Sequence, residues 1–124
     1  MTIIDVETGI SFQASRRGGT NHADYEPATQ DDTDKLKSIY GEWSWSRRAV
    51  VVIIDGEAFA GSMNGMPHGD YTISDNGYNG HSCIHFSGSR THGTNRVDEA
   101  HQEAIHVALN ADIDELNRKM EVVN

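Results

Sequence analysis

Apolar and polar residues alternate along the first fifteen positions, which predicts a β-hairpin. Ile4 and Val6 precede Thr8-Gly9, and apolar residues alternate again after this pair. A period of two places every second side chain of a strand on one face, so Ile4 and Val6 share a face. Residues 16–21, with the sequence Arg-Arg-Gly-Gly-Thr-Asn, are then expected to form a loop.

The strongest strand signal is the apolar run at residues 49–54. Asp55-Gly56 follows it, a pair typical of tight hairpin turns, and residues 57–61 are expected to return as the partner strand. Residues 62–80 are rich in glycine and asparagine and are expected to be irregular. Residues 81–86 predict a further strand.

Two segments show the period of an amphipathic helix. The first spans residues 31–40, begins at Asp31, Asp32 or Thr33 as cap, and ends at Gly41. The second follows Asp98, which is expected to be its N-cap. The apolar faces consist of Leu36, Ile39 and Tyr40 in the first helix and of Ile105, Leu109, Ile113, Leu116 and Met120 in the second.

These elements predict a single domain over residues 1–124 with an α+β, mainly β fold. The expected architecture is a small β-sandwich or barrel with one short helix and a C-terminal helix. A chain of 124 residues is long enough for one core. The longest apolar run is far shorter than the roughly 18 residues of a membrane span. A net charge of -9 argues against nucleic acid as a partner.

Histidines and a single cysteine concentrate the candidate chemistry in the second half of the chain. Five of the seven histidines lie between positions 68 and 101, and Cys83 falls within that interval. In the predicted strand, His81, Cys83 and His85 share one face. A lone cysteine is a buried thiol, a metal ligand or a nucleophile. Because an imidazole can accept the thiol proton, this pattern favours nucleophilic catalysis.

An ordered motif surrounds Cys83. His68-Gly69 begins a loop that contains Gly77 and leads to Gly80-His81-Ser82-Cys83-Ile84-His85. This order resembles the catalytic motif of L,D-transpeptidases of the YkuD type, in which a His-Gly or His-Ser pair and a glycine-containing loop precede a Ser-His-Gly-Cys-hydrophobic-Arg segment. His68 and Cys83 are 15 positions apart, close to the spacing of that motif.

The resemblance implies a cysteine peptidase or transpeptidase that acts on peptidoglycan stem peptides without a cofactor. Cys83 would form a thioester, His68 would be the general base, and His81 would help to shape the site. Backbone N–H groups around Ser82 and Cys83 would form an oxyanion hole. The residues expected to contact substrate are Gly69, Ser82, His85, Arg90 and His92.

The chain departs from the family pattern at three positions. Ser82 replaces the glycine before the nucleophile, Gly80 replaces a serine, and His85 replaces an arginine whose role Arg90 is a candidate to take over. The N-terminus has neither a basic n-region nor a hydrophobic h-region. We therefore expect synthesis in the cytoplasm without a visible signal peptide, and action at the cell wall after release by other means.

Two alternatives stay open: a zinc-dependent peptidoglycan hydrolase, and a non-catalytic module that binds a glycan or a protein. Catalytic zinc sites usually combine three protein ligands with a water molecule. Trp43 and Trp45 share a face if the chain is extended, where they would stack on a sugar ring or, as we expect, pack in the core. The candidate zinc ligands are His22, Asp24, His81, Cys83 and His85, with His92 and His101 as further competent residues.

Overall fold

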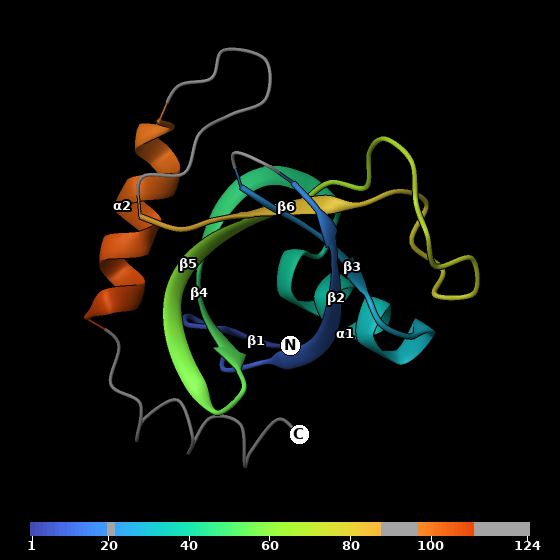
Figure 1. The fold of residues 1–124 in the computed structure, drawn as a ribbon, viewed down its shortest axis with the longest axis horizontal. Coiled ribbons are helices and arrows are strands. Elements are labelled where there is room, and N and C mark those ends of the chain that lie inside the picture. Colours follow the sequence, from blue (N-terminus) through green and yellow to red (C-terminus); the bar gives the residue numbers. More distant parts are fainter. Residues whose placement is uncertain (20–21, 88–96, 111–124) are drawn as a thin grey trace.

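The computed structural model describes residues 1–19, 22–87 and 97–110. Within these residues the chain forms six strands and two helices (Figure 1). The strands are β1 (Thr2–Asp5), β2 (Ser11–Gly18), β3 (Ala23–Pro27), β4 (Ser44–Ile54), β5 (Glu57–Gly65) and β6 (Ser82–His85), and the helices are α1 (Gln30–Tyr40) and α2 (Glu99–Leu109). The strands form a closed antiparallel barrel in the order β1-β2-β3-β6-β5-β4, so the fold is α+β and mainly β.

Both predicted hairpins are present, and their strands are longer than the sequence indicated. β1 and β2 pair antiparallel, but β2 continues through Gly18, so the loop expected from residue 16 onward is wrong at its start. β4 and β5 turn at Asp55 and Gly56, whose φ angles of 51° and 80° suit a tight hairpin turn. β5 continues to Gly65, so residues 62–65 are strand and not irregular.

The core lies inside the barrel because strand residues alternate between its interior and its outer side. On β4, Val50 and Val52 belong to the main apolar cluster, whereas Val51 packs with Ile4 in a small second cluster. On β6, Ile84 joins the main cluster and is fully buried. The neighbours of Ile84 in sequence therefore face the outer side.

Helix α1 begins at Gln30, one residue earlier than expected, because Thr29 is its N-cap. The Thr29 hydroxyl accepts a hydrogen bond from the Asp32 N–H at 3.2 Å, and the Asp32 carboxylate accepts one from the Thr29 N–H at 3.1 Å. This reciprocal pair satisfies donors that a helix start leaves open. The helix ends at Gly41 as predicted, and Leu36 and Ile39 join the main core.

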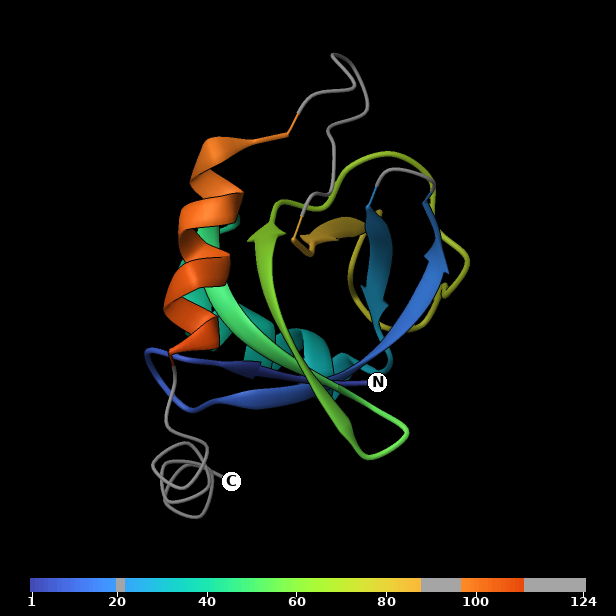
Figure 2. The same ribbon diagram turned by 60° about the vertical axis from the view of Figure 1, so that its left-hand side comes forward.

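Helix α2 runs along the outside of the barrel and packs against β4, β5 and β6 (Figure 2). Asp98 caps it as predicted by accepting a hydrogen bond from the His101 N–H at 3.0 Å. Its buried face differs from the expected stripe: it consists of His101, Ile105 and Ala108, while Leu109 is 63% exposed. The remaining stripe positions, Ile113, Leu116 and Met120, lie outside the described residues.

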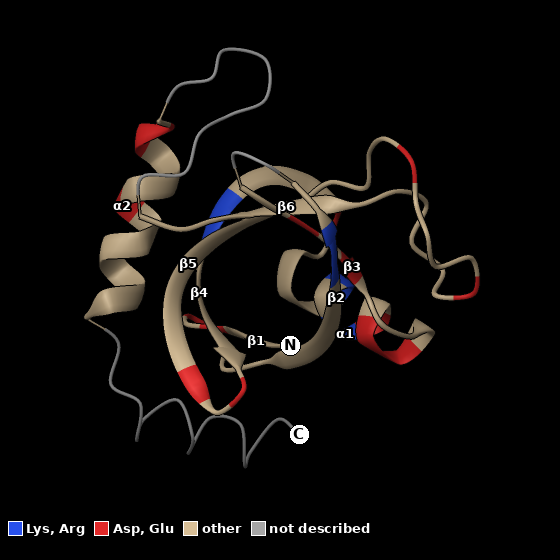
Figure 3. Ribbon diagram, in the orientation of Figure 1, with Lys and Arg blue, Asp and Glu red and all other residues tan. Residues whose placement is uncertain are grey.

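Charged residues are distributed over several elements, as Figure 3 shows for α1, α2, β2, β4 and the loop between β5 and β6. The two arginines of β4 pair with carboxylates, Arg47 with Asp98 at 2.7 Å and Arg48 with Asp5 at 2.9 Å. The cations of this strand are thus engaged within the protein. None of the described helices has the length and apolar composition needed to cross a membrane.

Candidate active site

The strand register places Cys83 between two polar side chains on the outer side of the barrel. Cys83 pairs with Asp24 of β3, and its neighbour Ile84 pairs with Met63 of β5, which brings Asn64 beside Cys83. The Cys83 Sγ atom lies 3.6 Å from Asp24 Oδ1, and the Cys83 N–H donates to Asn64 Oδ1 at 3.3 Å. Cross-strand neighbours thus define the surroundings of the thiol.

The loop between β5 and β6 returns beside its own start, as the sequence suggested. His68 and His81 form a two-residue antiparallel bridge with N–H···O distances of 3.0 and 2.9 Å. Gly80 permits this bridge because its φ is +134° and a Cβ atom there would lie 2.6 Å from the His68 N and O atoms. A serine at this position would not fit, because its Cβ atom would meet the His68 backbone.

The His68 imidazole lies next to the thiol of Cys83. Its Nε2 atom is 3.8 Å from Cys83 Sγ, and its Nδ1 atom lies 2.7 Å from the Met66 carbonyl oxygen. Because a carbonyl only accepts hydrogen bonds, Nδ1 carries a proton, and in the neutral ring Nε2 is then an acceptor facing the thiol. His68 is half-buried and lies beside the ring of Trp45, with centroids 4.7 Å apart.

His81 and the loop around it are fixed by two anchors. The His81 Nδ1 atom donates to the Asp70 carbonyl oxygen at 2.8 Å, and its ring lies 4.7 Å from that of His68. The fully buried Glu26 carboxylate accepts hydrogen bonds from the Thr72 N–H at 2.9 Å and the Thr72 hydroxyl at 2.5 Å. These contacts tie the loop to β3 and position both histidines.

The environment of Cys83 keeps its thiol protonated at neutral pH. Burial raises the pKa of Cys83 to about 12, the Asp24 carboxylate adds to this rise, and the hydrogen bond with Asn64 opposes it. A thiolate is therefore not present at rest. Nucleophilic attack by this thiol requires a base that removes its proton during the reaction.

A second group of histidines lies next to the cysteine, and we call it the imidazole stack: His22, His85 and His101. The His85 ring lies 3.9 Å from that of His101 with a 3° angle between planes, and 4.7 Å from that of His22 with 13°. His101 Nδ1 also lies 2.6 Å from the Ser62 hydroxyl. Burial, followed by the nearby His85, lowers the pKa of His101 to about 3.

Part of the predicted zinc set converges. Ligand atoms of His22, Asp24 and Cys83 all lie within 4.8 Å of one another, and all three residues are buried. His81 Nε2 lies 3.9 Å from Asp24 Oδ2, and His85 is held in the imidazole stack. The structure therefore brings together three of the five candidate ligands.

The expected substrate contacts fall in different places. Gly69 is exposed beside the histidine pair, where its φ is +67° and a Cβ atom would lie 2.6 Å from His81 Cε1, so the position favours glycine. Ser82 is fully buried and donates to the Met66 carbonyl oxygen at 2.9 Å. His85 is 3% exposed, so its side chain faces the stack and not a substrate. Arg90 and His92 lie outside the described residues.

Three features of the site were not apparent from the sequence. The Asn64 Oδ1 atom accepts a hydrogen bond from the Cys83 N–H, which was expected to form part of an oxyanion hole. The expectation that both tryptophans are in the core is wrong for Trp45, which is 49% exposed, whereas Trp43 packs edge-on against Tyr78 at 5.0 Å. Arg17 Nη1 lies 3.9 Å from Asp24 Oδ2. Arg17 is at a bulge of β2 that no local sequence signal indicated.

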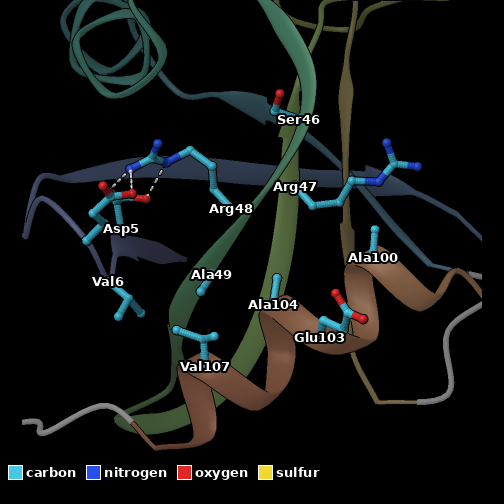
Figure 4. A pocket seen from close by; sticks show the side chains of 11 residues that line it. Asp5, Val6, Ser46, Arg47, Arg48, Ala49, Ala100, Glu103, Ala104 and Val107 are labelled. Atoms are coloured by element: carbon cyan, nitrogen blue, oxygen red, sulfur yellow. Dashed lines mark hydrogen bonds and ion pairs between the residues drawn. The ribbon is translucent and has the colours of Figure 1, made fainter.

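The large groove of the protein lies away from this cysteine. A hollow of about 830 Å³ opens between β4, the β1–β2 turn and α2, and Figure 4 shows the side chains that line it. Arg48 bonds Asp5 and Glu7 at its edge, and Arg47 pairs with Asp98. Among the residues that the structure describes, no cysteine or histidine lines this groove. Cys83 and its neighbours therefore remain the stronger candidate for chemistry.

Comparison with known proteins finds no match: no protein-family model, no curated protein and no solved structure is significantly similar to this chain. The fold and the arrangement around Cys83 are thus described by their own geometry.

Proposed function

We propose that this protein is a cysteine-dependent acyl-transfer enzyme that acts on peptidoglycan stem peptides, as an L,D-transpeptidase or as an L,D-carboxypeptidase or endopeptidase. Cys83 is the nucleophile and His68 is the general base. The observation that carries the proposal is the 3.8 Å distance between Cys83 Sγ and a His68 Nε2 atom oriented as an acceptor. The motif's resemblance to the YkuD type suggests the substrate class.

The first step forms a thioester. His68 Nε2 accepts the thiol proton while Cys83 Sγ attacks the carbonyl carbon of a stem-peptide bond. The tetrahedral intermediate then expels the amine, which takes the proton from the imidazolium of His68. This order of events suits a thiol whose pKa is raised, because the proton leaves during attack.

The second step releases the acyl group. A water molecule or an acceptor amine gives a proton to His68 Nε2 and attacks the thioester, and the Cys83 sulfur leaves and regains a proton. With water the reaction is hydrolysis, and with an amine it is transpeptidation. The same two side chains serve both outcomes.

The Cys83 N–H is the donor that we assign to the developing oxyanion. It is engaged by Asn64 Oδ1 at 3.3 Å, which is a long hydrogen bond. A substrate oxygen that carries negative charge is a stronger acceptor than a neutral amide. The substrate therefore replaces Asn64 as partner of this N–H in the transition state.

Trp45 supports a substrate path from the side of His68. Trp45 is 49% exposed and its ring lies beside the half-buried imidazole of His68, whereas Cys83 is 5% exposed. An exposed indole beside a catalytic base offers an apolar surface to a peptide or sugar. Substrate thus approaches over Trp45 and reaches the sulfur past His68.

Digestion of purified muropeptides, read by mass spectrometry, tests the proposal. The wild-type protein is expected to cleave stem peptides, or to exchange their terminal residue when an acceptor amine is added, and Cys83→Ala is expected to do neither. Because Cys83 is the sole cysteine, alkylation modifies one site and is expected to abolish turnover as well. Turnover by Cys83→Ala at the wild-type rate contradicts the proposal, and binding without turnover by both proteins indicates a binding module.

A zinc-dependent hydrolase is the second candidate function. The observation that favours it is the convergence of His22, Asp24 and Cys83 within 4.8 Å. A catalytic zinc ion would supply an activated water molecule. Chelation distinguishes the two candidates, because it abolishes turnover by a zinc hydrolase and leaves a cysteine enzyme active.

A further inference from the structure

We propose that His22, Asp24 and Cys83 form an inhibitory zinc site that holds the cysteine in an inactive, metal-bound state. The inhibitory effect rests on the acyl-transfer function proposed above, whereas the metal site itself does not. Asp24 and Cys83 pair across β3 and β6, and His22 directly precedes β3. The register of two neighbouring strands therefore fixes all three ligands on one face.

The distances fit tetrahedral zinc. With Zn–N and Zn–O bonds of about 2.0–2.1 Å and a Zn–S bond of about 2.3 Å, ligand atoms are about 3.3–3.7 Å apart. The structure has 3.1 Å between His22 Nε2 and Asp24 Oδ1, and 3.6 Å between Cys83 Sγ and the same oxygen. The ligand atoms of His22 and Cys83 are at most 4.8 Å apart, and small side-chain rotations bring them into the same range.

The donor set selects the metal. Thiolate and imidazole ligands suit zinc and cobalt, whereas calcium and magnesium prefer oxygen ligands alone. On binding, the Cys83 S–H bond breaks, a Zn–S bond forms, and the proton passes to solvent. His22 binds as a neutral imidazole through Nε2, with its proton on Nδ1. Asp24 Oδ1 and Cys83 Sγ, which contact each other, both become ligands of the ion.

Metal binding and acyl transfer oppose each other because zinc withdraws electron density from the sulfur that attacks the carbonyl carbon. The zinc-bound sulfur of Cys83 is therefore a much weaker nucleophile than the thiolate that His68 generates. The fourth zinc position is taken by water or by His68 Nε2, which is 3.8 Å from the sulfur. His68 has the outer contact typical of metal-bound histidines, since its Nδ1 donates to a backbone carbonyl.

Cobalt titration of the untagged, chelator-treated protein tests the site without reference to activity. We expect thiolate-to-cobalt charge-transfer absorption that saturates at one equivalent and disappears when zinc is added. Cys83→Ser is expected to lack this absorption, and His22→Ala and Asp24→Asn are expected to bind at least about tenfold more weakly. His106→Ala is the matched control, because His106 is exposed on α2 and keeps the histidine count equal to that of His22→Ala.

Two results would overturn the site. The first is the absence of charge-transfer absorption in the wild-type protein, a result that does not depend on whether any variant folds. The second is unchanged affinity in both His22→Ala and Asp24→Asn, because the metal then uses other ligands. Circular dichroism of each variant establishes that it is folded before its affinity is compared.

Measurements of stem-peptide turnover with and without zinc distinguish this inference from the proposed function. Saturating zinc is expected to stop stem-peptide turnover, and a chelator is expected to restore it, the opposite of what a catalytic zinc predicts. Turnover that persists in saturating zinc overturns the inhibitory role. Cobalt binding by a protein that never turns over stem peptides leaves the metal site standing and removes the proposed function.

Discussion

Two groups of histidines flank Cys83, and they differ in how their rings are held. His68 and His81, which we call the loop pair, each direct Nδ1 to a backbone carbonyl, at 2.7 and 2.8 Å. In the imidazole stack the rings are instead nearly parallel, and the closest two, His85 of β6 and His101 of α2, lie 3.9 Å apart. In the loop pair a backbone acceptor fixes the tautomer, whereas in the stack the rings pack face to face and His101 Nδ1 also contacts the Ser62 hydroxyl.

The position of a histidine in this fold therefore decides which contacts its ring nitrogens make. The two groups meet at β6: His81, directly before the strand, belongs to the loop pair, and His85, at its end, belongs to the stack. Cys83 lies between them, and the imidazole that faces its thiol as an acceptor belongs to the loop pair. We therefore expect substitutions in the loop pair to affect turnover and substitutions in the stack to affect stability.

The largest expected effect is loss of turnover in His68→Gln. Removal of the general base is expected to lower stem-peptide turnover about 10²–10⁴-fold, because the thiol proton then has no positioned acceptor. The measurement is initial rate on purified muropeptides, with folding checked by circular dichroism. His106→Gln, an exposed histidine on α2, serves as control and keeps the wild-type rate. Wild-type turnover by His68→Gln removes the loop pair from the mechanism.

Gly80→Ala is expected to cost about 2–4 kcal/mol of unfolding free energy. The residue has φ of +134°, and its Cβ would lie 2.6 Å from backbone atoms of His68, which cannot move away as a side-chain end can. Gly41→Ala is the matched control, with φ of +77° but nothing within 4 Å of its Cβ position, and should cost about 1–3 kcal/mol from backbone strain alone. Urea unfolding measures both. Equal losses would mean that the contact with His68 is not responsible.

The sequence correctly predicted the features that depend on residues close together in the chain. The Asp55-Gly56 turn, the Asp98 cap and the end of α1 at Gly41 are all present. Alternation along residues 81–86 also predicted that Cys83 and His85 share a face, because that depends only on the strand period. These features need no knowledge of a distant partner.

The features that the sequence did not predict depend on residues far away in the chain. β5 extends to Gly65 because β4 and β6 supply hydrogen-bond partners to a segment whose composition suggests a loop. Asp24 and Asn64 meet Cys83 only through the pairing of β3 and β5 with β6. No pattern in residues 81–86 indicates either neighbour. The sequence therefore predicted a reactive face but not the groups that set the protonation of its thiol.

In the stack, His101→Gln is expected to lower the unfolding free energy by about 1–3 kcal/mol, because it removes a buried ring packed against His85. The turnover of the folded variant should change little, since the His101 side chain contacts His85 and Ser62. His106→Gln on the same helix is exposed and should change stability by less than about 0.5 kcal/mol. Equal losses in the two variants, measured by urea unfolding, would show that the stack contributes nothing specific.

The last prediction is a pH dependence that belongs to His101, which is negligible near neutral pH and appears only in acid. Burial and the nearby His85 lower its pKa from 6.5 to about 3, with Arg47 and His22 acting in the same direction and Asp98 opposing them. Between these values the unfolded chain binds a proton at His101 and the folded chain does not. Stability is therefore full above pH 6.5 and falls as the pH drops toward 3, by at most about 1.4 kcal/mol per unit. His101→Gln lacks this loss, so its deficit relative to wild type should shrink from about pH 7 to about pH 4 in urea unfolding, whereas parallel pH profiles would show that His101 is not the group that titrates.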